Sequence, residues 1–184
     1  MGGHRVQPVT AAAGAERYNA VARTLHWVIA LVIIGNIIGG FFHDALEDVV
    51  NVMPLHKSLG LTVLALSLVR LGWRVANPAP PLPAHTPPWE KGAAHLTHAV
   101  FYILMIGLPM TGWLVSSGSK YPLNWFGLFD VPKFGITPDG AIDGFAHETH
   151  EIMGWVAVFL IVLHVGAALR HHFVLKDDVL RRMA

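Results

Sequence analysis

Two histidines stand near opposite ends of the last long apolar stretch of this chain. His150 and His164 lie 14 residues apart within residues 146–170. In an α-helix that separation is about 21 Å along the axis and about 40° short of complete turns, so both rings leave the helix from nearly the same face. An imidazole inside a membrane helix is costly and is a functional candidate by default. The spacing therefore predicts two metal centres, one above the other along the membrane normal.

The composition indicates a membrane protein whose metal ligands are nitrogen atoms. Of the 184 residues, enough for one domain, 53% are hydrophobic and only 14% are charged, which is below the usual charged share of a soluble protein. The chain has no cysteine, which excludes disulfides, iron–sulfur clusters held by thiolates, and haem attached through a C-x-x-C-H motif. It has 12 histidines, so any redox cofactor must be held by their imidazole nitrogens.

Four apolar segments are long enough to cross a bilayer, whose hydrocarbon core is about 30 Å thick. They are residues 20–42, 55–75, 92–116 and 146–170. The pattern predicts an all-α fold, an integral membrane four-helix bundle that occupies residues 20–170. We expect a short cytoplasmic leader over residues 1–19, which lack the apolar core of a signal peptide, and a cytoplasmic tail over residues 171–184. Pro54 suits the first turn of the second helix, and the aromatic-rich residues 117–143 suit a loop at the membrane interface.

Lysine and arginine are distributed unequally between the two sides of such a bundle. Ten of the 13 fall in the leader, the second connection, the tail and the adjoining ends of the spans, and only Lys57, Lys120 and Lys133 fall on the other side. Because positive charge is retained inside the cell, both termini are predicted to face the cytoplasm. The outer side also carries eight acidic residues against its three basic ones, a formal charge of −5.

This topology places four histidines in two pairs of equal depth. His26 and His164 lie toward the cytoplasm, and His56 and His150 lie toward the outer side. Two imidazoles that face each other across a bundle would clamp one haem iron from both sides, whereas zinc would require four ligands together. A single histidine in a membrane often does no more than hydrogen-bond to a neighbouring helix. Two pairs matched in depth favour haem over that simpler interpretation.

Several short motifs along the chain support the same interpretation. They are TLHWV, MPLHKSLG, VRLGWR, AHLTHAVFY, GLPMTGW and HETHEIMG followed by LHVGAALRHHF. From about Tyr18 onward the chain resembles the bacterial cytochrome b561 family, four-helix di-haem cytochromes of the inner membrane. The resemblance implies two haem b groups, one held by His26 and His164 on the cytoplasmic side and one by His56 and His150 on the periplasmic side.

Three further residues are candidates for contact with the cytoplasmic haem. His98 is the rival of His26 as a ligand, although a supporting role beside the haem is favoured over ligation. Arg70 and Arg74 lie four residues apart at the end of the second span and would pair with haem propionates. The positive-inside rule explains these two arginines equally well.

A haem with two imidazole ligands has no open position and passes electrons through its edge. We therefore predict a transmembrane electron carrier linked to the quinone pool. The cytochrome b561 family includes a superoxide oxidase. The resemblance therefore implies electron transfer from periplasmic superoxide to ubiquinone. For that reaction we expect His171 at the quinone site, as a hydrogen-bond donor or proton relay, although interfacial anchoring is its simpler role. The acidic balance of the outer side would repel superoxide unless a local basic patch exists. Lys57, next to His56, is the best candidate for that patch, and Lys120 and Lys133 are others.

Other functions remain open at this level. The acidic outer face would also suit a basic electron-transfer protein of the periplasm. The chain would equally serve as the membrane cytochrome b subunit of a larger respiratory complex, without an activity of its own, and a packing protein without redox chemistry is the third alternative. We expect membrane lipid and quinone as partners, no nucleic acid, and a multi-pass location in the bacterial inner membrane.

Overall fold

Four long helices make up most of the computed structural model, which describes residues 17–82 and 86–184. They are α1 (Ala20–Phe41), α3 (Met53–Ala76), α4 (Pro88–Gly118) and α5 (Ala141–Arg170). Each is long and apolar enough to cross a membrane. The predicted all-α fold with four membrane-spanning helices is therefore confirmed. The expected leader falls mostly on residues outside the described part of the chain.

The helices α1, α3 and α4 each begin at a residue that satisfies or removes one of the first free N–H groups. The side chain of Asn19 accepts a hydrogen bond from Ala22 N at 2.9 Å and caps α1. Pro54 occupies the first turn of α3, as predicted, where its missing N–H costs nothing. The helices α4 and α5 start at Pro88 and Ala141, earlier than the predicted residues 92 and 146. In each helix the first turn consists of residues that precede the apolar segment.

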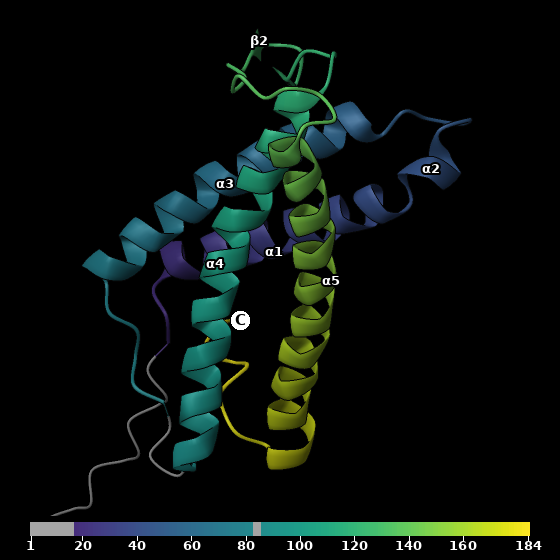
Figure 1. Ribbon diagram of the computed structural model, residues 1–184. Coiled ribbons are helices and arrows are strands. Elements are labelled where there is room, and N and C mark those ends of the chain that lie inside the picture. The colour runs from purple at the N-terminus through teal and green to yellow at the C-terminus, as the bar shows by residue number, and fades with distance from the viewer. Residues whose placement is uncertain (1–16, 83–85) are drawn as a thin grey trace, which may run out of the picture.

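Each long helix packs along the next one in the sequence. The extensive contacts run from α1 to α3, from α3 to α4 and from α4 to α5. In Figure 1, α4 and α5 stand side by side, and α1 and α3 run obliquely across them. Among the long helices of the described chain, α5 therefore has its extensive contacts with α4.

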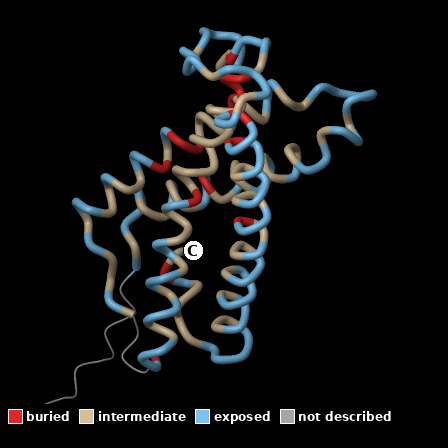
Figure 2. Tube along the Cα trace, in the orientation of Figure 1, coloured by how far each residue is buried: buried red, intermediate tan, exposed pale blue. Residues whose placement is uncertain are grey.

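The four helices bury few of their apolar side chains. Figure 2 shows that the buried stretches are short and scattered along the trace. The buried hydrophobic residues of the described chain are Ile29, Val63, Leu64, Leu104, Leu123, Ala146 and Ala157. Large apolar side chains elsewhere stay exposed, for example Leu31 at 69% and Phe159 at 62%. This distribution is expected when the outer faces of helices contact lipid tails.

A short hairpin covers one end of the bundle. In the connection after α4, β1 (Asn124–Trp125) pairs antiparallel with β2 (Phe129–Asp130). The hairpin is fixed to α3, because Trp125 Nε1 donates to Thr62 Oγ1 at 3.1 Å and Phe126 N donates to Ser58 Oγ at 3.1 Å. We call this the hairpin end. The short helix α2 (His43–Leu46) follows α1 at the same end.

The last described residues return to the start of α1 and define the opposite end of the bundle. After α5, a π-helical turn, η1 (His171–Leu175), ends at Lys176, whose φ of 55° lies in the left-handed region. The chain then reverses (Figure 1). Trp27 Nε1 donates to Met183 O at 2.8 Å, and Arg23 Nη1 donates to Ala184 O at 2.7 Å. We call this the tail end. From here on, the tail means residues 176–184, the part of the predicted tail that follows η1.

Candidate cofactor-binding site

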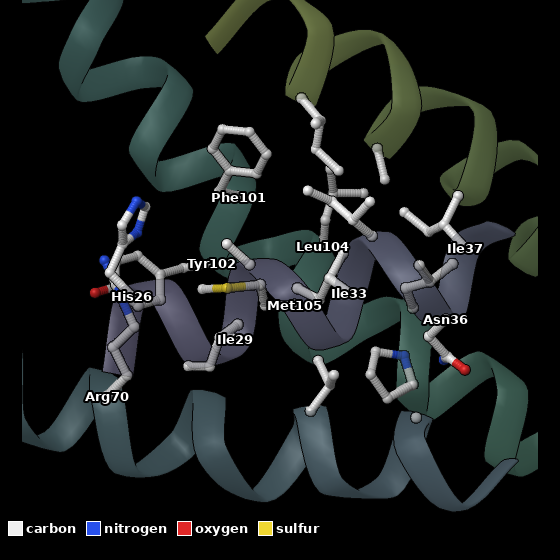
Figure 3. A pocket seen from close by; sticks show the side chains of 18 of the residues that line it. His26, Ile29, Ile33, Asn36, Ile37, Arg70, Phe101, Tyr102, Leu104 and Met105 are labelled. Carbon is white, nitrogen blue, oxygen red and sulfur yellow. The ribbon is translucent and has the colours of Figure 1, made fainter. Parts of the chain in front are cut away.

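A cavity of about 1460 Å³ lies between the four long helices. Pockets for single small molecules usually have about 300–1,000 Å³, so this cavity has room for more than one such group. Figure 3 shows His26, Arg70 and Tyr102 at one end of the view and Asn36 at the other. The side chains between them are apolar and come from α1 and α4, namely Ile29, Ile33, Leu104 and Met105. The cavity therefore has an apolar middle and polar ends.

The structure brings His56 of α3 and His150 of α5 together toward the hairpin end. Their ring centroids are 6.1 Å apart, and the ring planes meet at 88°. His56 Nδ1 lies 3.0 Å from Asn36 O, and His150 Nδ1 lies 3.0 Å from Leu108 O. A carbonyl oxygen only accepts hydrogen bonds, so Nδ1 of each ring carries the proton. The Nε2 atom of each ring consequently keeps a free lone pair, the arrangement that metal-binding histidines use.

Two glycines stand directly against these two rings. A Cβ atom on Gly40 would lie 2.7 Å from Cε1 of His56, and a Cβ atom on Gly112 would lie 3.0 Å from Cε1 of His150. The backbones of α1 and α4 thus approach the rings as closely as glycine alone allows. Each imidazole is thus positioned by one helix, which supplies both the glycine and, one turn earlier, the carbonyl oxygen that accepts the Nδ1 hydrogen.

At the tail end His164 of α5 has two histidine neighbours. The centroid of His26 on α1 is 6.2 Å from that of His164, and the centroid of His98 on α4 is 6.0 Å away. All three residues line the cavity, and Phe101 also contacts His164, with centroids 5.3 Å apart. Distance to His164 therefore does not distinguish His26 from His98.

The separation of the rings fits two ligands on one metal. An imidazole nitrogen binds a metal at roughly 2 Å, and the ring centre lies about 1 Å further, so two opposed ligands have centroids about 6 Å apart. Among the described residues, no group of three or more His, Cys, Asp or Glu could hold a metal ion by itself. The donor set thus fits a metal whose remaining ligands belong to a planar cofactor, as in haem.

The other residues singled out from the sequence lie in different places. Arg70 and Arg74 are half-buried and line the cavity at the tail end, where Arg74 Cζ is 5.9 Å from the centroid of the Tyr18 ring. Lys57 lines the cavity at the hairpin end, next to His56 in sequence.

His171 is not among the residues that line the cavity. Its Nδ1 lies 2.5 Å from Oδ2 of Asp177, and the two side chains are 16% and 9% exposed. Sequence reasoning missed Asp177, and it also missed Arg182, which is buried and lines the cavity. No periodicity points to either residue, because both follow the chain reversal at Lys176.

Comparison with known proteins gives consistent results over the whole described chain. The family model described as prokaryotic cytochrome b561 matches residues 17–184. Cytochrome b561 homolog 2 of Escherichia coli (strain K12) is 34% identical, with 91% of each chain covered. The probable superoxide oxidase CybB of Yersinia pestis is 29% identical, with 91% of this chain and 96% of that protein covered. Cytochrome b562 of Cereibacter sphaeroides is 30% identical, with 90% and 94% covered.

Proposed function

This chain belongs to the prokaryotic cytochrome b561 family of membrane cytochromes, and from that premise we propose that it holds two haem b groups and moves electrons across the membrane to quinone. Membership of the family implies b-type haem. The number two is supported by one observation above all, the presence of two imidazole pairs at two heights of a single cavity.

The proposed ligands of the haem at the hairpin end are His56 and His150. Each ring donates its Nδ1 hydrogen to a backbone carbonyl, which fixes the ring and leaves Nε2 for iron. Thr111 Oγ1, 3.1 Å from Nδ1 of His150, adds a second contact to that ring. These contacts orient both rings and leave the lone pair of each Nε2 atom free to bind a metal.

The proposed ligands at the tail end are His26 and His164. The helix α4, which carries His98, packs along α5, whereas α1, which carries His26, packs along α3. The pair formed by His26 and His164 therefore joins helices on opposite sides of the cavity, where a large planar group has space. His98 is then a neighbour of the bound group and not its ligand.

When bound, the two haems supply one-electron redox chemistry, and two imidazoles on each iron leave no open coordination position. The chain itself holds and orients the cofactors and keeps water out of the cavity with residues such as Ile29, Ile33 and Leu104. By the positive-inside rule, the tail end faces the cytoplasm of the inner membrane and the hairpin end faces the periplasm.

The more specific form of the proposal is a superoxide:ubiquinone oxidoreductase. Two superoxide anions each lose one electron and become O2, while ubiquinone gains two electrons and two protons and becomes ubiquinol. The name of the relative from Yersinia pestis supports this reaction. Lys57 would attract superoxide at the hairpin end, and His171, with its Nδ1 held by Asp177, would present Nε2 to a quinone oxygen.

The optical spectrum of the purified protein tests the proposal. A reduced-minus-oxidised difference spectrum with a haem assay is expected to give two haems b per chain. His56→Ala and His164→Ala are each expected to remove one haem and leave the other. A protein without haem would overturn the proposal. A di-haem protein that does not reduce ubiquinone with superoxide would overturn only its more specific form.

A further inference from the structure

The cavity carries opposite charges at its two ends. The acidic residues that line it all lie toward the hairpin end, and they are Asp44, Glu148 and Glu151. Arg17, Arg70, Arg74 and Arg182 line the tail end. Within the part of the chain that the structure describes, no aspartate or glutamate lines the cavity at that end. The tail end therefore gathers guanidinium groups without an acidic partner in the same cavity.

Arg182 is the most deeply buried of these arginines. The residue is 8% exposed, and its Nη1 donates to Pro81 O at 2.7 Å. Its Nε is buried and has no hydrogen-bond partner among the described residues. A guanidinium has five N–H donors, and a buried cation without an anion is costly. The adjacent Arg181 differs in each respect, because its side chain is 67% exposed and its Nη1 lies 3.3 Å from Oδ1 of Asp178.

Hydrogen bonds of the tail connect Arg182 and its neighbour to residues beside His26 and Arg74. Tyr18 N donates to Arg182 O at 3.1 Å, and the ring of Tyr18 lies under the guanidinium of Arg74. The next residue of the tail accepts a hydrogen bond from Trp27, whose ring is 5.3 Å from that of His26. Arg182 and Arg74 are thus linked through Tyr18, and the residue after Arg182 is linked through Trp27 to His26.

We propose that Arg182 completes a carboxylate-binding site at the tail end of the cavity, together with Arg70 and Arg74, and that it binds a propionate of the haem at this level. The inference rests on the proposed function and adds a residue and a segment to it. A haem b carries two carboxylates at one edge, and arginine pairs with a carboxylate through two parallel N–H···O bonds. The buried Nε of Arg182 has the donor that such a pair requires.

Two measurable consequences follow from a guanidinium at this place. A positive charge near the iron favours the reduced form, so its removal lowers the midpoint potential of the nearby haem. A contact between the tail and the cofactor also makes each stabilise the other. Loss of the tail-end haem is therefore expected to speed amide hydrogen exchange in residues 176–184.

A redox titration of the purified full-length protein tests the inference, with the haem-to-protein ratio measured on the same samples. Arg182→Gln is expected to lower the midpoint potential of the tail-end haem and to leave that of the other haem unchanged. Arg181→Gln removes the same charge one residue away and is expected to change neither. Repeating Arg182→Gln in a His56→Ala background, which keeps only the tail-end haem, identifies the haem whose potential moves. Normal haem content with unchanged potentials would show that Arg182 only anchors the tail to Pro81.

A haem with esterified propionates tests whether the anion bound at this site is a haem carboxylate. This test does not depend on a change in midpoint potential. Chain produced without haem is loaded with haem b or with its dimethyl ester, which lacks both carboxylates. Wild-type protein is expected to retain haem b better than the ester at the tail end, and Arg182→Gln is expected to reduce that preference. An equal preference in both proteins would overturn the inference. A wild-type chain that binds neither compound would instead overturn the proposed function.

Discussion

A Cβ atom on Gly40 of α1 would lie 2.7 Å from Cε1 of His56 on α3. Two non-bonded carbon atoms cannot approach so closely without a steric clash, so the ring would have to move. Its Nδ1 is held by Asn36 O, one turn earlier on the same helix as Gly40. Movement of the ring would therefore break the hydrogen bond that orients it and turn Nε2 away from the cavity.

Gly40→Ala is accordingly expected to lower the haem content from two per chain toward one. The ordinary effect of this substitution inside a helix is a gain of about 0.5–1 kcal/mol in stability, so a loss of haem would come from the ring contact. Gly39→Ala is the matched control, because a Cβ atom there meets nothing within 4 Å. Equal haem content in the two variants would show that the position of the His56 ring is not needed for binding.

Variants of His26 and His98 test which of the two is the second ligand of the tail-end haem, because both rings lie almost equally far from His164. His26→Ala is expected to remove the tail-end haem, because that ring stands across the cavity from His164. His98→Ala is expected to keep both haems and to change only the spectrum or midpoint potential of one. The haem-to-protein ratio of the two variants checks this directly. The reverse result would assign the ligand role to His98.

The helices and the two histidine levels were predictable because both depend on regular spacing along the chain. Fourteen residues between His150 and His164 determine depth and direction in any straight helix. Apolar length determined the four spans, which the structure confirms. The proximity of His98 to His164 was not predictable to the same degree, because it depends on how closely α4 and α5 pack. Sequence spacing contains no information on that distance.

The tail shows a second limit of sequence reasoning. Its reversal depends on Lys176, a residue type without preference for the left-handed region that it occupies. Without that turn, Asp177 would not reach back to His171, and Arg182 would not enter the cavity. The hairpin at Asn124–Asp130 was also not predicted. Its strands are only two residues long, which is too short for an alternating pattern to show in the sequence.

Asp177 is expected to support quinone reduction through His171. Its carboxylate holds Nδ1 of His171, so Asp177→Asn would loosen the ring and weaken its ability to exchange a proton at Nε2. We expect a fall of about 10–100-fold in quinone reduction at unchanged haem content, by analogy with the loss of the residue that orients a metal-binding histidine. Steady-state reduction of a soluble ubiquinone analogue measures it.

Asp178→Asn is the control for this experiment. Asp178 is adjacent in sequence, its side chain is 49% exposed, and its partner is the exposed Arg181. The control is expected to keep the wild-type rate of quinone reduction. An equal loss in both variants would indicate a general weakening of the tail, and no loss in either would remove His171 and Asp177 from the quinone site.

Lys57 is expected to raise the rate of superoxide oxidation at the hairpin end. It lines the cavity there among Asp44, Glu148 and Glu151, so the local field would repel an anion without it. Lys57→Gln is expected to slow superoxide-dependent quinone reduction several-fold, and added salt is expected to accelerate the variant more than the wild type, because salt screens repulsion. Lys120→Gln changes the charge by the same amount at an exposed residue that does not line the cavity, and it is expected to have little effect. A rate in Lys57→Gln equal to that of Lys120→Gln at every ionic strength would show that superoxide does not approach through this end of the cavity.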